Sequence, residues 1–548
     1  MLVAEAVGRA LPALGVDAVF GLLGSGNLAL TNSMRDAGAR FWSARHETGA
    51  MCMADGYARV SGRAAACSVH QGPGLTNAIT GLTEAAKSRT PLVVLAADTP
   101  SAAVRSNFRI DQGGLVEAVG AVAERVHGPD TALADVARAV RRARVERRAV
   151  VLMLPLDVQA MECPNGEAPP AAGPELAPAQ PAAESVRALA DLLAEARRPA
   201  IVAGRGAVLS DAGPALRRLG ELTGAVLATS AVANGLFAGD PFEVGIAGGF
   251  SSPAAARLLG EADVVVALGA ALNQWTTRHG TLIAPGARVA QVDVDAEAIG
   301  AHRAVDAGVV GDARATAEAL VAGLEERGAD GRGRRTPELA AAIRAGRWRD
   351  VPYEASAAAG VLDPRALSTA LDELLPAERT VVVDSGAFMG WPSMYLRVPD
   401  AAGFVFPQAF QCVGLGLGNA IGAAIARPDR LTIAAVGDGG ALMALPELET
   451  LARLRPRMLV VIYDDAAYGA EVHHFRPLGQ AVDLAQFPDT DFAALAEAAG
   501  CRGLTARRVE DLEGVRDWLA APDRPLVLDA KVDPDVCGEW LEEAFRGH

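Results

Sequence analysis

The stretch LTIAAVGDGGALMALPELETLARL, residues 431–454, decides the fold of this chain. An apolar run ends at Gly437–Gly440, and apolar residues at helical spacing follow. Glycines at such a turn let backbone N–H groups approach an anion, and the helix dipole favours negative charge there. Asp438 in this position can hold a hard cation that bridges to a phosphate. The alternative is an ordinary turn in which Asp438 caps the helix.

The next stretch, MLVVIYDDAAYGAEVHHF (458–475), places Asp464-Asp465 at the carboxyl end of another apolar run. The 24 residues from Gly440 to Tyr463 have the length of a helix plus a strand, which is a parallel crossover. Neighbouring parallel strands would then bring Asp438 and Asp465 to one edge of the sheet, where open α/β sheets bind ligands. Because two close carboxylates repel unless a cation lies between them, this pattern favours a Mg²⁺–diphosphate site.

Apolar runs of strand length recur between helical patterns along the whole chain. Runs that are apolar at consecutive positions suit strands buried on both faces, and the helices between them supply parallel crossovers. We therefore predict an α/β fold with three domains, each an open parallel sheet. The clearest runs are 149–155, 200–204, 225–230, 263–270, 288–295, 380–386, 431–439, 458–465 and 525–532.

Two stretches without a strand or helix period divide the chain. Residues 163–185, CPNGEAPPAAGPELAPAQPAAES, are rich in Pro and Ala and predict an extended linker. Residues 326–360 predict a second linker that contains a short helix. The domains are then 1–162, 186–325 and 361–540, followed by a frayed tail at 541–548.

Charge and cysteine content exclude several classes of protein. The 548 residues carry 51 Lys+Arg and 66 Asp+Glu, a net charge of −15, which argues against a nucleic-acid partner. No apolar run approaches the ~18 residues of a membrane-spanning helix, and the N-terminus lacks a signal-peptide pattern. The 6 cysteines form no CxxC and fit a reducing compartment. We expect a cytoplasmic enzyme with no membrane partner.

Two motifs in the first domain could carry chemistry. RHETGAMCMADGYARVSG (45–62) places Glu47 in the first turn of a predicted helix. AAACSVHQGPGLTNAITGL (64–82) ends a strand at His70 and opens a helix with a Gly-Pro-Gly turn. Each motif has a structural alternative, because an acid in the first turn also complements the helix dipole and a lone histidine is often structural.

Taken together, the Glu47 motif, the HQGPGLTNAITGL turn and the Gly-Asp-Gly and Asp-Asp blocks resemble the thiamine-diphosphate-dependent 2-oxo acid enzymes. The nearest resemblance is to the acetohydroxyacid synthase, pyruvate oxidase and benzoylformate decarboxylase group. It covers essentially the whole chain, with pyrimidine-binding, central and diphosphate-binding domains in that order. It implies thiamine diphosphate and Mg²⁺ as cofactors and a small 2-oxo acid as substrate. It also implies a homodimer at least, with tetramers common, because family sites form between two subunits.

The resemblance implies roles for individual residues. Glu47 matches the glutamate that hydrogen-bonds the aminopyrimidine ring of thiamine and promotes removal of the proton from C2. Asp438 and Asp465 match the Mg²⁺ ligands, with the carbonyl of Ala467 as a third ligand. The other cofactor-binding positions are Ser385, Gly386, Val413, Gly437, Gly439, Gly440 and Tyr468, where Val413 replaces a bulky residue that bends the cofactor.

Four further positions are implied on the substrate side: Ser25, His70, Gln112 and Glu471. The resemblance makes His70 a proton relay and Glu471 the acid that protonates the enamine, so the two would form an acid–base pair. The alternative is that Glu471, with His473 and His474, lies on a solvated helix face.

The sequence also departs from the family pattern. Asp464 and Asp465 stand where the family usually has Asn, which adds negative charge near a diphosphate. Gly440 replaces a common Ser, and Val413 is smaller than the usual Met or Leu. The stretch Ala271–Trp275 lacks the Arg-Phe-Asp-Asp-Arg pattern of the FAD-containing synthases, which argues against FAD.

We therefore expect an enzyme that decarboxylates a 2-oxo acid. It would add the resulting enamine to a carbonyl acceptor, as an acetolactate-synthase-like carboligase, or release it as an aldehyde, as a decarboxylase. An acyl-CoA lyase of the same fold and a non-catalytic binding or assembly protein are the alternatives.

Overall fold

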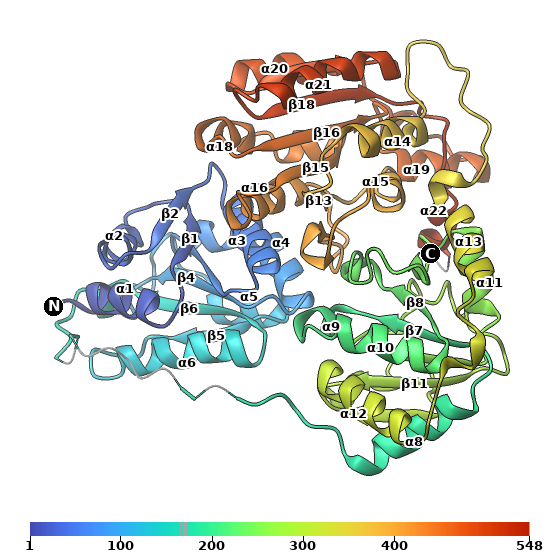
Figure 1. The fold of residues 1–548 in the computed structure, drawn as a ribbon. Helices are drawn as coiled ribbons and strands as arrows, with labels where there is room; N and C mark the ends of the chain where they lie inside the picture. The colour runs from blue at the N-terminus through green and yellow to red at the C-terminus, as the bar shows by residue number, and fades with distance from the viewer. Residues whose placement is uncertain (165, 168–172, 175, 547–548) are drawn as a thin grey trace.

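The computed structural model describes residues 1–164, 166–167, 173–174 and 176–546. Within these residues the strands form three six-stranded sheets, all their strand pairings are parallel, and helices pack around each sheet (Figure 1). This confirms the predicted α/β class with three open parallel sheets. None of the described helices has the length and apolar character needed to cross a membrane.

The N-terminal sheet has the strand order β2-β1-β3-β4-β6-β5. Its inner strands β3, β4 and β6 are buried at every position, as expected for apolar runs covered on both faces. The elements of this domain are α1 Val3–Ala13, β1 Ala18–Gly21, α2 Leu28–Asp36, β2 Arg40–Ser43, α3 Glu47–Ser61, β3 Ala65–Val69, α4 Pro73–Lys87, β4 Leu92–Asp98, α5 Gln112–Ala118, β5 Val122–Arg125, α6 Ala132–Val145, β6 Ala149–Pro155 and α7 Leu156–Gln159.

The central sheet has the order β12-β11-β10-β7-β8-β9. Its elements, with those of the segment that follows it, are α8 Ala183–Glu195, β7 Pro199–Ala203, α9 Arg205–Leu209, α10 Gly213–Thr223, β8 Val226–Thr229, η1 Ala231–Ala233, β9 Glu243–Ile246, α11 Pro253–Gly260, β10 Val264–Leu268, β11 Arg288–Asp293, η2 Ala296–Ala298, β12 Ala307–Val310, α12 Ala313–Glu326, η3 Gly331–Gly333, α13 Pro337–Ala345 and η4 Trp348–Asp350.

The C-terminal sheet has the order β14-β13-β15-β16-β18-β17. Its elements are α14 Pro364–Leu374, β13 Arg379–Val383, α15 Gly390–Tyr395, η5 Ala401–Gly403, β14 Phe404–Val405, α16 Gly416–Ala426, β15 Leu431–Gly437, α17 Asp438–Met443, α18 Glu447–Leu454, β16 Met458–Asp464, α19 Gly469–Phe475, η6 Arg476–Leu478, η7 Asp483–Ala485, α20 Phe492–Ala499, β17 Arg502–Ala506, η8 Val509–Leu512, α21 Glu513–Ala520, β18 Leu526–Lys531 and α22 Trp540–Phe545.

Two predicted boundaries differ from the structure. Helix α8 begins at Ala183, inside the predicted linker, because its apolar face packs into the central core. The predicted frayed tail is wrong for residues 541–545, since Leu541 is only 6% exposed and α22 packs into the C-terminal core. Of the two predicted segments, residues 165, 168–172, 175 and 547–548 lie outside the described residues.

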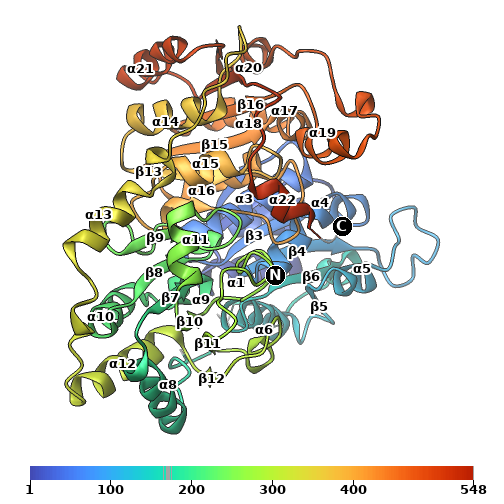
Figure 2. The same ribbon diagram turned by 90° about the vertical axis from the view of Figure 1, so that its right-hand side faces the viewer.

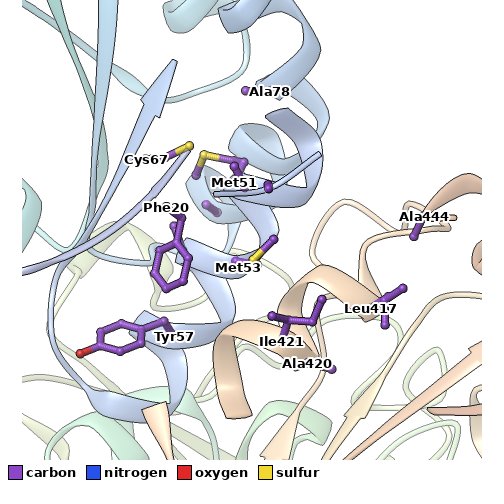
Figure 3. Close-up of a cluster of buried hydrophobic side chains, with 14 of the residues drawn as sticks. Phe20, Met51, Met53, Tyr57, Cys67, Ala78, Leu417, Ala420, Ile421 and Ala444 are labelled. Carbon is purple, nitrogen blue, oxygen red and sulfur yellow. The ribbon is translucent and has the colours of Figure 1, made fainter. Parts of the chain in front are cut away.

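Helix α3 of the N-terminal domain packs directly on α16 of the C-terminal domain (Figure 3). Glycines let the two backbones touch. A Cβ atom added to Gly56 would fall on the carbonyl oxygen of Asn419, and a Cβ atom added to Gly422 would fall on the carbonyl oxygen of Met53. Met53 and Ile421 belong to one continuous core that joins the two domains. This contact fixes how the first and third sheets of one chain are placed.

Candidate active site

Asp438 and Asp465 follow two neighbouring strands of the C-terminal sheet. Strand β15 pairs with β16 in parallel, with Gly437 opposite Tyr463. Asp438 comes directly after β15 and Asp465 directly after β16, so both leave the sheet at the same edge. Both carboxylates line one large cavity of about 1700 Å³.

The surroundings of these two carboxylates suit a cation. Burial raises the pKa of Asp438 to about 7, and the nearby Asp464 adds to this shift. Burial, and after it the charge of Asp438, raises the pKa of Asp465 to about 8. The described residues contain no group of three or more His, Cys, Asp or Glu that could hold a metal by itself. Mg²⁺, however, is usually held by one or two carboxylates together with phosphate oxygens, so this donor set fits a Mg²⁺–diphosphate pair.

Small residues form the walls around the two carboxylates. Ser385 and Gly386 follow β13, and Gly439 and Gly440 open α17. A Cβ on Gly439 would lie 2.9 Å from the ring of Tyr468, and one on Gly440 would meet the Asp384 carboxylate. The glycines therefore keep the backbone accessible where a diphosphate would bind. All of the cofactor positions and metal ligands predicted in this domain line the cavity. They are Ser385, Gly386, Val413, Gly437, Asp438, Gly439, Gly440, Asp465, Ala467 and Tyr468.

Asp384 is a functional candidate that the sequence reasoning missed. Its buried carboxylate accepts hydrogen bonds from the backbone N–H groups of Gly414, Leu415 and Gly416, at 2.9, 3.1 and 3.0 Å. Burial raises its pKa to about 6, although these hydrogen bonds act in the opposite direction. Asp384 thus ties the Ser385 turn to the loop that carries Val413. The available signal was an Asp directly after the apolar run at 380–383.

The four candidates of the N-terminal domain gather at the carboxyl edge of their own sheet. Each follows a different strand: Ser25 follows β1, Glu47 follows β2, His70 follows β3 and Gln112 lies beyond β4. Glu47 is 8% exposed, and its Oε2 accepts a hydrogen bond of 3.0 Å from Nδ2 of Asn77, a contact that the sequence did not predict. Asn77 follows the Gly-Pro-Gly turn in α4, so the two N-terminal motifs meet in space.

His70 and Gln112 differ in how their polar atoms are used. The amide of Gln112 is fully engaged, since its Oε1 accepts from Gly72 N at 2.9 Å and its Nε2 donates to Ala97 O at 3.0 Å. Among the described residues, Nδ1 of His70 is buried without a hydrogen-bond partner. The His70 ring lies 5.2 Å from that of Phe108, in the loop that projects beside α5 in Figure 2. We conclude that Gln112 shapes the loop, whereas no hydrogen bond to Nδ1 fixes the ring of His70 among the described residues.

The two groups of candidates do not meet within one chain. The N-terminal residues that line the large cavity belong to α6 or lie just before strands, as Leu14 does before β1, Arg89 before β4 and Arg147 before β6. The cavity is therefore bounded by α6 and the amino edge of the first sheet. Glu47 and His70 follow the carboxyl ends of their strands and are absent from the lining. His70 and Glu471, predicted as an acid–base pair, are consequently not brought together in one chain.

Helix α19 presents Glu471 to the cavity but directs its histidines elsewhere. Glu471 is exposed and lines the cavity, whereas neither His473 nor His474 does. The ring of His474 stacks on Phe545 of α22, with centroids 4.1 Å apart. Burial lowers the pKa of His473. Leu541 and Phe545 also line the cavity, so the C-terminal helix forms part of its wall.

Three domain descriptions of one family match the chain in order. They are "Thiamine pyrophosphate enzyme, N-terminal TPP binding domain" at residues 1–122, the central domain of the same family at 186–320 and its C-terminal TPP binding domain at 384–530. The second range contains every strand of the central sheet, whereas the first ends at the start of β5 and the third begins just after β13.

Several characterised proteins are similar over nearly their full length. A sulfoacetaldehyde acetyltransferase of Rhodobacter capsulatus is 30% identical, covering 100% of this chain and 96% of the relative. An acetolactate synthase of Mycobacterium bovis is 30% identical over 97% of this chain and 88% of the relative. A probable 2-ketoarginine decarboxylase of Pseudomonas aeruginosa is 32% identical, covering 94% of this chain and 91% of the relative. Among solved structures, a thiamine diphosphate-dependent 4-hydroxybenzoylformate decarboxylase of Rhodococcus jostii shares the fold, with a TM-score of 0.83, 24% identity and coverage of 97% and 99%.

Proposed function

The chain belongs to the thiamine pyrophosphate enzyme family, and from this premise we propose that it is a Mg²⁺-dependent enzyme that decarboxylates a 2-oxo acid. The remaining acyl unit would be transferred to a carbonyl acceptor, as in an acetolactate synthase, or released as an aldehyde. Relatives named as acetyltransferase, synthase and decarboxylase support this range of outcomes.

The observation that carries the proposal is the pair of carboxylates, one buried and one half-buried, at the ends of β15 and β16. Asp438 and Asp465 would hold Mg²⁺, with the carbonyl of Ala467 as a third protein ligand. Ser385, Gly439 and Gly440 would surround the diphosphate with backbone and small side chains. Bound thiamine diphosphate would supply a carbon nucleophile and accept the electrons left by the departing carboxylate.

Glu47 would bind the aminopyrimidine ring and hold a proton there. Glu47 is buried, and among the described residues its side chain accepts a hydrogen bond from Asn77 at Oε2, which leaves Oε1 for this partner. His70 would move a proton at its unpartnered Nδ1, and Ser25, exposed in the loop after β1, would contact the substrate. Glu471 would supply the other acid group, from the diphosphate side of the site.

A second copy of the chain would complete the site. Glu47 and Asp438 lie at sheet edges that do not face one another within one chain, so both can reach one cofactor only if two chains pair. Exposed apolar side chains flank both sets of candidates, as expected for surfaces covered in a dimer. They are Leu23, Leu28, Val104, Phe108 and Ile110 around the first set and Phe410, Met443, Phe475, Leu478, Leu484 and Phe487 around the second.

The proposal includes no FAD. The stretch Ala271–Trp275 replaces the flavin-associated pattern, and Trp275 packs edge-on against Phe250, with ring centroids 5.1 Å apart. Phe250 in turn contacts Phe406 and Trp540 of the C-terminal domain, so Trp275 belongs to the packing between domains.

The test is CO₂ release from a panel of aliphatic and aromatic 2-oxo acids, with product identification, with and without thiamine diphosphate and Mg²⁺. Cofactor-dependent CO₂ with free aldehyde would identify a decarboxylase. An acyloin or a 2-hydroxy-2-alkyl-3-oxo acid would identify a carboligase. Absence of CO₂ from every acid, in a protein that binds the cofactor, would reject the proposal and favour an acyl-CoA or acyloin substrate.

A further inference from the structure

Lys531 is a buried lysine beside the turn that carries Asp465. It lies at the end of β18, directly opposite Asp464 in the parallel register with β16. Lys531 is 4% and Asp464 3% exposed, and Nζ of the lysine lies 2.5 Å from Oδ2 of Asp464. From the sequence, Asp464 is an extra negative charge near the predicted diphosphate. The structure gives that charge a partner.

Asp464 also shapes the turn that follows it. Its Oδ1 accepts a hydrogen bond of 3.0 Å from Ala466 N, while its Oδ2 holds Lys531. Ala466 has a φ of +53°, a left-handed conformation that a residue with a side chain rarely adopts. One residue further, Ala467 N donates to Oδ1 of Asp465 at 3.2 Å. Both oxygens of Asp464 are thus engaged, one in the strained turn and one in the ion pair.

The negative charge of Asp464 requires a positive partner such as Lys531. Asp464 acts electrostatically on both Asp438 and Asp465, which stand next to the predicted diphosphate. Without a partner it would be a third buried carboxylate beside an anionic ligand, and an uncompensated buried charge is strongly unfavourable. Lys531 binds further acceptors as well: Asp489 Oδ1 at 2.5 Å, Thr490 O at 2.6 Å and Asp529 Oδ2 at 3.0 Å.

We propose that Lys531 is a positioning residue for the cation and the diphosphate. Through its ion pair with Asp464 it holds the 464–467 turn in shape and cancels a negative charge that would otherwise weaken binding of the anionic cofactor. This inference rests on the proposed function of Asp438 and Asp465. On this proposal the positive charge of Lys531 compensates Asp464. The chain can therefore carry an Asp at position 464, where the family usually has Asn.

The test measures binding of thiamine diphosphate at fixed Mg²⁺ by titration calorimetry, together with the unfolding midpoint of each variant. Lys531→Met should weaken binding at least about 10-fold, which corresponds to about 1.4 kcal/mol. The double variant Asp464→Asn with Lys531→Met should bind within about 3-fold of the unmodified protein, because the uncompensated charge next to the site is gone.

A matched control uses the other buried partner of the lysine. Asp529 is fully buried and contacts Lys531 but is not part of the 464–467 turn. Asp529→Asn with Lys531→Met should regain stability without regaining affinity. If Lys531→Met folds poorly, the two double variants still give this comparison.

Two results would overturn the proposal: unchanged affinity in Lys531→Met, or equal rescue of affinity by Asp464→Asn and Asp529→Asn. The second result would make Lys531 only a core ion-pair residue. Because affinity is measured without turnover, a protein that binds the cofactor but releases no CO₂ would contradict the proposed reaction and leave the test of Lys531 intact.

Discussion

Glu47 and Asp438 lie at the carboxyl edges of two different sheets of the same chain, and only Asp438 lines the large cavity. The α3–α16 contact places the two sheets in this relationship, because Gly56 and Gly422 let the backbones of the two helices touch. The backbone next to Glu47 is held from the C-terminal domain of its own chain, since Glu447 Oε1 accepts a hydrogen bond of 3.0 Å from His46 N. Within one chain, Glu47 and Asp438 therefore lie at edges that belong to different sheets and do not meet.

This relationship predicts complementation between inactive variants. Glu47→Ala and Asp438→Ala should each abolish 2-oxo acid decarboxylation alone, while co-expression should restore activity to about one quarter of the sites in randomly mixed symmetric dimers. The assay is CO₂ release, with two affinity tags to verify that mixed dimers form. Mixed dimers without activity, formed from two variants that are each inactive alone, would mean that both residues serve a site within one chain.

Asp465 should tolerate Asn better than Asp438 does. Asp465 carries the higher pKa of the pair, raised first by its burial and then by Asp438, so removing its charge relieves repulsion while an amide oxygen remains as a ligand. We expect Asp465→Asn to bind thiamine diphosphate with Mg²⁺ within about 3-fold of the unmodified protein, and Asp465→Ala and Asp438→Asn to bind at least about 10-fold more weakly.

The measurement is the thermal shift caused by thiamine diphosphate, with Mg²⁺ and again with EDTA. Chelation should remove the shift in every variant that retains it. A shift that persists in EDTA would show that the two carboxylates do not act through a cation.

The fold and the placement of Asp438 and Asp465 at one sheet edge were predictable because both depend on local patterns. Consecutive apolar residues identify strands buried on both faces, and the interval between Gly440 and Tyr463 fixes a parallel crossover. Asp438 and Asp465 then had to leave the same sheet edge. No comparable pattern exists for the ion pair of Asp464 with Lys531. The two residues are separated by 66 others in the sequence, and only the register of β16 with β18 brings their side chains together.

The acid–base pair of His70 and Glu471 could not be tested from sequence for a related reason. The sequence predicts the loop that carries each residue separately. It does not predict how α3 packs on α16, and that packing decides which sheet edges face each other. The C-terminal helix was misjudged because charged residues at 542, 543 and 546 resemble a frayed end. Its burial comes from Trp540 and Leu541, which pack against a distant part of the chain.

Glu243 should make stability fall as pH rises. Burial raises its pKa from 4.5 to about 7, against the opposing charges of Arg347 and Arg217. A carboxyl with a higher pKa in the folded state binds its proton more tightly there, so folding loses stability between about pH 4.5 and pH 7 as the unfolded chain deprotonates first. Glu243→Gln should therefore be more stable than the unmodified protein at pH 8 by about 1–2 kcal/mol, allowing for partial solvent screening.

Urea unfolding at pH 5 and pH 8 checks this expectation for Glu243. The exposed Glu326, at the end of α12, provides the control, and Glu326→Gln should leave the pH dependence of the midpoint unchanged. Equal pH dependence in Glu243→Gln and the unmodified protein would exclude Glu243 as the source.

The glycine contact between α3 and α16 should be sensitive to a single methyl group. In Gly56→Ala the new Cβ would fall on the carbonyl oxygen of Asn419, so the helices must separate and the shared core must loosen. Such overpacking typically destabilises by about 1–3 kcal/mol. Gly323→Ala in α12 is the matched control, because nothing lies within 4 Å of its Cβ and a helical Gly-to-Ala change normally stabilises by about 0.5–1 kcal/mol. Urea midpoints that move in opposite directions would support a rigid contact between the two domains, whereas a neutral Gly56→Ala would show that the helices can shift apart freely.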